Sequence, residues 1–372
     1  MAPTKPSLEL LRSLSDEHVL RALMAQRRAT RAELAVATGL SKPTVSESVR
    51  RLSAAGHVVD TGERTTGRGR IGTYYGLPAT TGCALVASIA PEGIVAEAVD
   101  VYGEVVARSE AQVSRAPGTR HVARALERVA GEVASGAGPA RVAVVSAADP
   151  VDRETGRLVE LPDAPFLVGA LDAPAVLGDL VDGAVVVDND VNWMARAEHG
   201  HDDFVYVYLG EGVGAAVVSD GEVRRGHAGL AGEIAHVVTA GPDGTAMRLT
   251  EVFAALGLRR RGSTAIDVPA LLAAVETDAV RRALARAVSG LLSAAVALAD
   301  PAVVLLGGPW GRDPAVLAAV AREFAAAPRH VPVEAAAVDD EPALAGARET
   351  ALRRLRDAIV AAAPRQPGFR PG

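Results

Sequence analysis

The sequence TRAELAVATGLSKPTVSESVRRL, residues 30–52, has the pattern of two short helices joined by a tight turn. Thr30 and Glu33 have the spacing of a capping box, in which hydroxyl and carboxylate each accept a hydrogen bond from a backbone amide at the helix start. Gly39 is expected to end this helix, because glycine adopts the left-handed conformation at a helix C-terminus at little cost. Ser41 is expected to cap the helix that follows.

The second helix has an apolar face and a polar, basic face. Pro43 lies in its first turn, where a missing amide costs nothing. Val45, Val49 and Leu52 recur at i, i+4 and i+7, so they face inward together. The residues expected to face outward are Lys42, Thr44, Ser46, Glu47, Arg50 and Arg51. This is the pattern of a helix-turn-helix, whose second helix enters the major groove of DNA; the alternative is an ordinary helical hairpin with a solvated face.

The flanking sequence completes a winged helix over residues 1–77. Residues 1–14 are expected to form a leader or short helix, and Ser15 to cap a first helix that ends at Gln26. Residues 57–77 contain two β-prone runs around a basic tip, typical of a wing. Slim, cationic tips suit phosphates or an A·T minor groove, although a solvated basic loop has the same composition. The expected DNA contacts are Arg31, Ser41, Lys42, Thr44, Ser46, Glu47, Arg50, Arg51, Arg68 and Arg70.

Charge divides the chain in the same way. Residues 1–77 hold 12 Lys/Arg against 7 Asp/Glu, a net charge of +5, whereas the other residues hold 27 against 38, a net charge of −11. This asymmetry is typical of a small DNA-binding head on an acidic effector body. A single cysteine, Cys83, excludes an internal disulfide and any multi-cysteine zinc site. No secretory signal pattern is present, and the longest apolar run is interrupted at Asp300-Pro301, so we expect a soluble, cytoplasmic protein without membrane contact.

After a hinge at residues 78–82, the body at residues 83–363 alternates strand and helix patterns. Three β-prone runs, an amphipathic helix and a buried strand come first, and a similar series begins with the strand AVVVDND and a helix over residues 191–199. Such a repeat predicts an α/β fold of two lobes with a cleft between them. A helix over residues 343–362 precedes a tail, residues 364–372, that is expected to be disordered.

The body resembles the ROK family, which groups sugar kinases with sugar-responsive repressors. The resemblance rests on VVVDNDVNWMARAEHG, YVYLGEGVGAAVVSDGEVRRGHAGLAGEIAHV, DPAVVLLGG and ALAGARETAL, together with the head sequence and its GRGR tip. It implies a two-lobed actin/hexokinase-like (ribonuclease H-like, duplicated) fold with sugar in the cleft. By the same resemblance, the sugar ligands are Asn189, Asp190, Glu233, His236 and Glu251. Their amide and carboxylate groups suit vicinal hydroxyls, although each alone is also typical of a helix cap or a satisfied buried residue.

Three segments depart from the family's kinases. The phosphate loop Asp-x-Gly-Gly-Thr is replaced by residues 88–92, Ser-Ile-Ala-Pro-Glu, in which Pro91 lacks an amide donor and Glu92 is negative. Glu211 lies where a second loop has threonine, and Asp149 adds another carboxylate. Because each change opposes a bound triphosphate, Asp190, the family's general base, is expected to serve as a sugar ligand alone. We expect neither an enzyme nor a cofactor.

The zinc site of the family is also expected to be missing. Zinc-containing members combine the histidine of G-E-x-x-H with three cysteines, whereas no cysteine follows His236 here. The segment around Asp163 also departs from the family's Asn- and Gly-rich turn. These differences leave open a regulator whose sugar pocket is vestigial.

The leading interpretation is a sugar-responsive transcriptional repressor. A homodimer would place two recognition helices about 34–36 Å apart on a pseudo-palindromic operator. Within each helix, Glu47 has two possible uses: it accepts from a cytosine amino group or it orients a neighbouring arginine. A sugar kinase that carries a DNA-binding head is the alternative of a different class.

Overall fold

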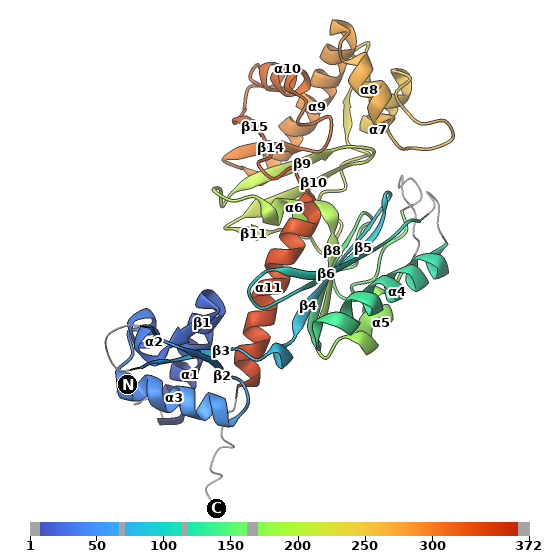
Figure 1. Ribbon diagram of the computed structural model, residues 1–372. Coiled ribbons are helices and arrows are strands. Elements are labelled where there is room, and N and C mark those ends of the chain that lie inside the picture. The colour runs from blue at the N-terminus through green and yellow to red at the C-terminus, as the bar shows by residue number, and fades with distance from the viewer. Residues whose placement is uncertain (1–7, 67–70, 114–117, 162–169, 364–372) are drawn as a thin grey trace, which may run out of the picture.

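The computed structural model describes residues 8–66, 71–113, 118–161 and 170–363 of the chain. Figure 1 shows three bodies in chain order: a small N-terminal head, a first α/β lobe and a second α/β lobe, with a long C-terminal helix running between them. The expected terminal tail at residues 364–372 lies outside the described residues.

The head is a winged helix, as predicted. Its elements are α1 (Leu8–Gln26), β1 (Arg28–Thr30), α2 (Arg31–Thr38), α3 (Lys42–Ala54), β2 (Val59–Arg64) and β3 (Thr73–Gly76), and the strands form an antiparallel sheet in the order β1-β3-β2. The capping box of Thr30 and Glu33 is present, and Gly39 ends α2 with a φ of 71°. Ser41 caps α3 by accepting from the Thr44 amide. Local capping chemistry therefore determines both ends of the turn.

The start of α1 differs from the prediction. The helix begins at Leu8, and Ser15 lies inside it, where its hydroxyl donates to the Leu11 carbonyl oxygen at 2.8 Å. A serine that bonds back to residue i−4 satisfies itself within a helix and needs no cap position. Ser15 as an N-cap was therefore wrong.

Lobe 1 is built on a five-stranded sheet in the order β6-β5-β4-β7-β8. Its elements are β4 (Cys83–Ala90), β5 (Gly93–Val99), β6 (Val105–Ala111), α4 (Thr119–Ala137), β7 (Ala140–Ala147), α5 (Ala173–Leu177) and β8 (Val185–Asn189), preceded by a 3₁₀ turn at Ala79–Thr81 in the predicted hinge. The strands β4, β7 and β8 are parallel, and β5 and β6 form antiparallel hairpins. One face is covered by α4 and α5, whose apolar side chains join its core.

Lobe 2 repeats this topology in the order β11-β10-β9-β14-β15. Its elements are α6 (Asp190–Ala197), β9 (Phe204–Leu209), β10 (Val213–Ser219), β11 (Glu222–Val223), β12 (Val238–Ala240), β13 (Ala246–Arg248), α7 (Leu249–Ala255), α8 (Val268–Ala274), α9 (Asp278–Ala299), β14 (Val303–Gly307), α10 (Pro314–Phe324) and β15 (Val333–Ala335). As in lobe 1, the first strand of the lobe lies between two kinds of pairing. On one side β9 is followed by β14 and β15 in parallel pairing, and on the other by β10 and β11 in antiparallel pairing. The two predicted lobes therefore share one architecture.

Among the helices of the described residues, α9 is long and apolar enough to cross a membrane by length and composition. Half of that stretch is buried in the protein, and Leu284, Val288 and Leu291 pack in the core of lobe 2. These contacts are those of a core helix.

The C-terminal helix α11 (Pro342–Ala362) joins the head to both lobes. It packs on α6 and on the sheet face formed by β4 and β7 (Figure 1). Near its end, Leu355 and Ile359 belong to the same hydrophobic cluster as Leu20 of the head. Arg21 of α1 also pairs with Asp357 at 3.0 Å. No pattern in the sequence indicated that the head docks on the last helix.

Candidate functional site

The outer face of α3 is the candidate DNA-binding surface. Lys42, Glu47 and Arg50 are exposed, and Thr44 and Ser46 are half-buried. Arg50 donates to both Glu47 carboxylate oxygens at 3.0 and 2.6 Å, and this contact holds the pKa of Glu47 below its ordinary value. Glu47 therefore orients a neighbouring arginine in the absence of DNA, and its contact with a cytosine amino group stays a prediction.

Arg51 does not face outward. Its guanidinium pairs with Asp16 of α1 at 2.6 Å, and its side chain is only 20% exposed. Asp16 is buried and also accepts from the Ser48 hydroxyl. Arg51 as a DNA contact stays a prediction, and in the structure an acidic residue 35 positions earlier holds its guanidinium against the head.

The other predicted DNA contacts lie around α3. Arg31 is exposed at the start of α2, with its guanidinium 5.0 Å from the centre of the Tyr75 ring. Ser41 is engaged as the α3 cap, and its hydroxyl also bonds the Thr44 hydroxyl at 2.8 Å. Arg68 and Arg70 lie outside the described residues.

A cavity of about 440 Å³ lies where lobe 1, lobe 2 and the start of α6 meet. This volume is within the range of small-molecule sites. The polar residues that line it include Ser88, Glu92, Asn189, Asp190, Tyr208, Glu211, Glu233, His236, Thr250 and Thr264. Four of the five predicted sugar ligands therefore lie around one space.

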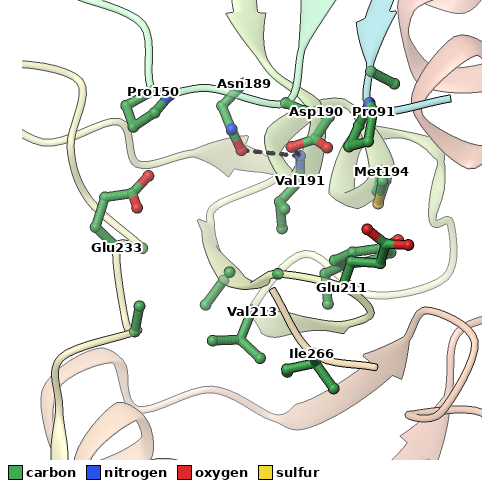
Figure 2. Close-up of a pocket in the computed structure, with 18 of the residues that line it drawn as sticks. Pro91, Pro150, Asn189, Asp190, Val191, Met194, Glu211, Val213, Glu233 and Ile266 are labelled. Carbon is green, nitrogen blue, oxygen red and sulfur yellow. Dashed lines mark hydrogen bonds between the residues drawn. The ribbon is translucent and has the colours of Figure 1, made fainter. Parts of the chain in front are cut away.

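Asn189 and Asp190 are positioned by the end of β8 and the start of α6 (Figure 2). The Asn189 side-chain oxygen accepts from the Val191 amide at 3.0 Å, and its amide group donates to the Ala147 and Asp149 carbonyl oxygens, both at 3.4 Å. Asn189 thus caps α6 and fixes the β7 exit loop. Asp190 also accepts from the Val191 amide, at 2.8 Å.

Burial raises the pKa of Asp190 to about 7, and the negative charges of Asp149, Glu233 and Glu92 add to this effect. Desolvation also raises the pKa of Glu233, a residue that is exposed along the cavity wall. Asp190 is therefore held closer to its neutral form by burial and by the charges around it.

Glu251 is not among the cavity-lining residues. It is exposed in the first turn of α7, where its carboxylate accepts from the Arg248 amide at 3.0 Å. A glutamate at the third helical position is favoured as a capping group, and its neighbour Thr250 lines the cavity instead. The structure thus does not bring Glu251 together with the other four predicted ligands.

The segments that were expected to depart from the phosphate loops of the family's kinases also meet at this cavity. Pro91 and Glu92 line it from the β4–β5 turn, and Glu211 lines it from the β9–β10 loop. Glu211 pairs with Arg260, and Asp149 is buried beside Asp190. Asp163 lies outside the described residues. Within the part of the chain that the structure describes, no group of three or more His, Cys, Asp or Glu is placed to hold a metal ion.

Tyr208 is a lining residue that the sequence analysis missed. It lies at the carboxyl end of β9, and the alternation of Phe204, Tyr206 and Tyr208 places all three in contact with one hydrophobic cluster. That alternation was the available signal, because side chains two apart share a face of a strand. Burial and the nearby charges of Asp190, Glu92 and Glu211 raise the Tyr208 pKa.

The substitution Asp190→Asn is expected to raise the melting temperature at pH 8 and to raise it by only about a third as much at pH 5. Because the folded-state pKa of about 7 exceeds the unfolded value of about 4, the carboxyl destabilises the fold increasingly as the pH rises between these two values. Allowing for its partial exposure, the gain at pH 8 is roughly 2 kcal/mol, or about 3–6 °C.

Differential scanning fluorimetry at both pH values measures this effect. Asp340→Asn, at an exposed position, is the matched control and is expected to change neither value. An equal gain from Asp190→Asn at pH 5 and pH 8 would contradict the charge-based explanation.

Two family models match the chain. Residues 93–252 match the ROK family, and residues 18–69 match the MarR family. Among curated proteins, the glucokinase of Streptomyces coelicolor is 38% identical over 66 residues, which cover 16% of this chain and 20% of that enzyme. The bifunctional enzyme NanE/NanK of Brucella melitensis is 28% identical over 148 residues, covering 36% of this chain and 28% of that enzyme. The chain thus spans about a fifth to a quarter of these relatives' length.

Solved structures resemble the chain over more of its length. A ROK family transcriptional regulator, described as a homolog of the E. coli MLC protein, has a TM-score of 0.64 and 18% identity and covers 94% of this chain and 98% of its own. A ROK family glucokinase from Streptomyces griseus, in complex with glucose and AMPPNP, has a TM-score of 0.54 and 22% identity and covers 72% and 99%. At these identities the likeness is one of fold, and it extends over head and body in the first case.

Proposed function

We propose that this chain is a cytoplasmic DNA-binding regulator that responds to a sugar and acts as a repressor. The reason is that it joins a ROK family domain to an N-terminal MarR-like winged helix. The observation that carries the proposal is the cavity: Asn189, Asp190, Glu233 and His236 surround one space in a chain that also carries an exposed recognition helix. Amide and carboxylate groups of this kind bind hydroxyls and reject ligands that lack them.

The head supports DNA binding through its charge and its exposed face. Lys42 at the start of α3 would contact a phosphate, and Arg50, held by Glu47, would contact the backbone or a base edge. Two such heads in a homodimer would read the two halves of a pseudo-palindromic operator. Sugar binding between the lobes would change operator affinity if it favours one lobe arrangement over another.

The cavity opposes the alternative of an ATP-dependent kinase. A triphosphate needs amide donors and cations, whereas Pro91 supplies no amide and Glu92 and Glu211 bring negative charge to the same space. Because the glucokinase and NanE/NanK relatives are enzymes, the test below also measures kinase activity.

The substitution Lys42→Ala is expected to weaken DNA binding by a similar factor for all sequences and to reduce the salt slope of affinity by about 1, because a phosphate contact carries no base information. An operator selected from random duplex DNA, followed by fluorescence anisotropy at several salt concentrations, measures both quantities. Arg329→Ala removes the same charge from an exposed site in lobe 2 and is expected to leave binding unchanged. Equal losses from the two variants would contradict a specific contact at Lys42.

The sugar response is tested by thermal shift with free sugars and with ATP-Mg²⁺. A ligand at a hundredfold excess over its dissociation constant stabilises by about 2.7 kcal/mol. We expect a shift with a sugar that Asp190→Ala abolishes, together with release of the operator in anisotropy. A shift with ATP-Mg²⁺ and phosphorylation of a sugar would instead support the kinase.

A further inference from the structure

One end of the cavity is strongly acidic. Glu92 from the β4–β5 turn, Asp190 from α6 and Glu211 from the β9–β10 loop all line it, and all three act electrostatically on the Tyr208 phenol between them. In Figure 2 the Asp190 and Glu211 carboxylates point into the same space from opposite sides. We call this region the acidic end, defined by Glu92, Asp190, Glu211 and Tyr208.

Acidic side chains outnumber basic ones among the described residues that line the cavity. Among the described lining residues there is no lysine or arginine, while four carboxylates line the space and His236 is the one basic group. Arg260 offsets Glu211 from outside the lining. Asp149, buried beside Asp190, adds further negative charge. A ligand that carries negative charge would therefore meet repulsion at close range, and a positive ligand would relieve it.

The aromatic ring at the acidic end is a second feature of the same kind. Tyr208 lines the cavity and packs against Gly210, where an added Cβ would lie 2.6 Å from a ring carbon. Glycine at position 210 therefore lets the ring lie close to the loop. An aromatic ring beside carboxylates is favourable for an ammonium group, which donates hydrogen bonds to the acids and is attracted by the ring.

We propose that the cavity selects its sugar by charge, favouring amino sugars with an ammonium group at the acidic end and excluding sugar phosphates. This inference rests on the proposed function, because it names the class of sugar for the same cavity. Asn189, beside Asp190 (Figure 2), and Glu233 and His236 elsewhere on the cavity wall would bind the hydroxyls. The cavity volume of about 440 Å³ has room for a monosaccharide with water.

The test is isothermal titration calorimetry at pH 7 with ligands that share a ring and differ in charge. For the gluco, galacto and manno series, the 2-amino sugar, the neutral parent hexose, its N-acetylated form and the 6-phosphate are compared. In the series that binds, we expect the amino sugar to bind at least tenfold more tightly than the parent hexose and the 6-phosphate to bind at least tenfold more weakly.

Glu92→Gln is the most informative variant, because Glu92 is exposed at a turn and its replacement leaves a group of the same size. It is expected to weaken the amino sugar about three- to tenfold and the neutral hexose by a smaller factor. Glu211→Gln is also expected to weaken binding of the amino sugar. It provides a second test that does not depend on the turn that carries Glu92. Glu222→Gln, an exposed carboxylate on β11, is the control and is expected to have no effect.

The outcomes separate this inference from the proposed function. Equal affinity for amino and neutral sugars, or tighter binding of the 6-phosphate, overturns charge selection while sugar binding stands. If no sugar in any series binds a protein that still binds its operator, both charge selection and the sugar response are overturned, and the vestigial pocket is supported.

Discussion

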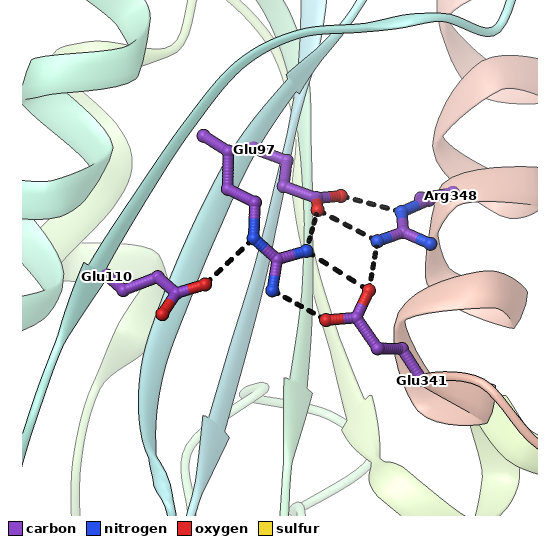
Figure 3. Close-up of polar contacts among 5 residues, drawn as sticks. Glu97, Glu110, Glu341 and Arg348 are labelled. Atoms are coloured by element: carbon purple, nitrogen blue, oxygen red, sulfur yellow. Dashed lines mark hydrogen bonds and ion pairs between the residues drawn. The ribbon is translucent and has the colours of Figure 1, made fainter.

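Replacing Glu97 with alanine is expected to lower the free energy of unfolding by about 3 kcal/mol. Glu97 lies on β5 with its side chain almost fully buried, and it accepts from Arg108 at 2.6 Å and from Arg348 of α11 at 2.6 and 2.8 Å (Figure 3). Removing one member of a buried ion pair leaves the others without their partner, at a cost of about 3–5 kcal/mol. The lower figure applies because both arginines keep contacts with Glu341.

Urea denaturation followed by circular dichroism measures this loss. The control is Glu110→Gln in the same cluster, because Glu110 is 55% exposed and pairs with Arg108 at 2.9 Å. An exposed pair contributes about 0–1 kcal/mol, so this variant is expected to stay close to the wild-type protein. Similar losses from both variants would show that burial is not the source of the effect.

Replacing Gly346 with valine is expected to cost at least about 3 kcal/mol and to separate α11 from α6. An added Cβ would overlap the Trp193 carbonyl oxygen and would lie 2.9 Å from the Trp193 carbonyl carbon and 3.2 Å from the Ala197 amide nitrogen. Overpacking typically costs 1–3 kcal/mol, and here every neighbour is backbone that a rotamer change does not move. Trp193 is itself fixed by a hydrogen bond from its indole to the Val145 carbonyl oxygen at 3.0 Å.

The matched control is Gly131→Ala in α4, where an added Cβ has no atom within 4 Å. Alanine in an open helical position is expected to stabilise by about 0.5–1 kcal/mol. Melting temperatures of the two variants give the comparison. A Gly346→Val protein as stable as the wild type would contradict close packing of these helices.

The sequence predicted the head well because the signals there are local. Thr30, Glu33, Gly39 and Ser41 each act within four residues of chain, so their roles follow from spacing alone. The first of the three β-prone runs predicted for the body is found as β4. The presence of two similar α/β lobes also followed from the alternation of elements, whereas their strand order comes from the structure.

The sequence was less informative where the decisive contact is distant in sequence, or where the same residue spacing is typical of two different roles. Arg51 looked like a surface cation because its partner, Asp16, lies on another helix. Glu251 had the spacing of a helix-capping glutamate as well as the family position of a ligand, and the structure shows the cap. Tyr208 escaped notice because a tyrosine in an apolar strand is usually a core residue, and its nearness to three carboxylates depends on the packing of both lobes.

The position of α11 in the chain has a consequence for synthesis of the protein. Lobe 1 begins first, yet the helix that covers the β4–β7 face comes from residues 342–362, after all of lobe 2. At about 5–20 residues per second, the nascent sheet waits on the order of ten seconds or more for this cover. The ribosome thus completes the first lobe last, and the apolar side chains Val86 and Val144, which share a cluster with Leu344 and Ala347, are the surface that a chaperone would meet in the interval.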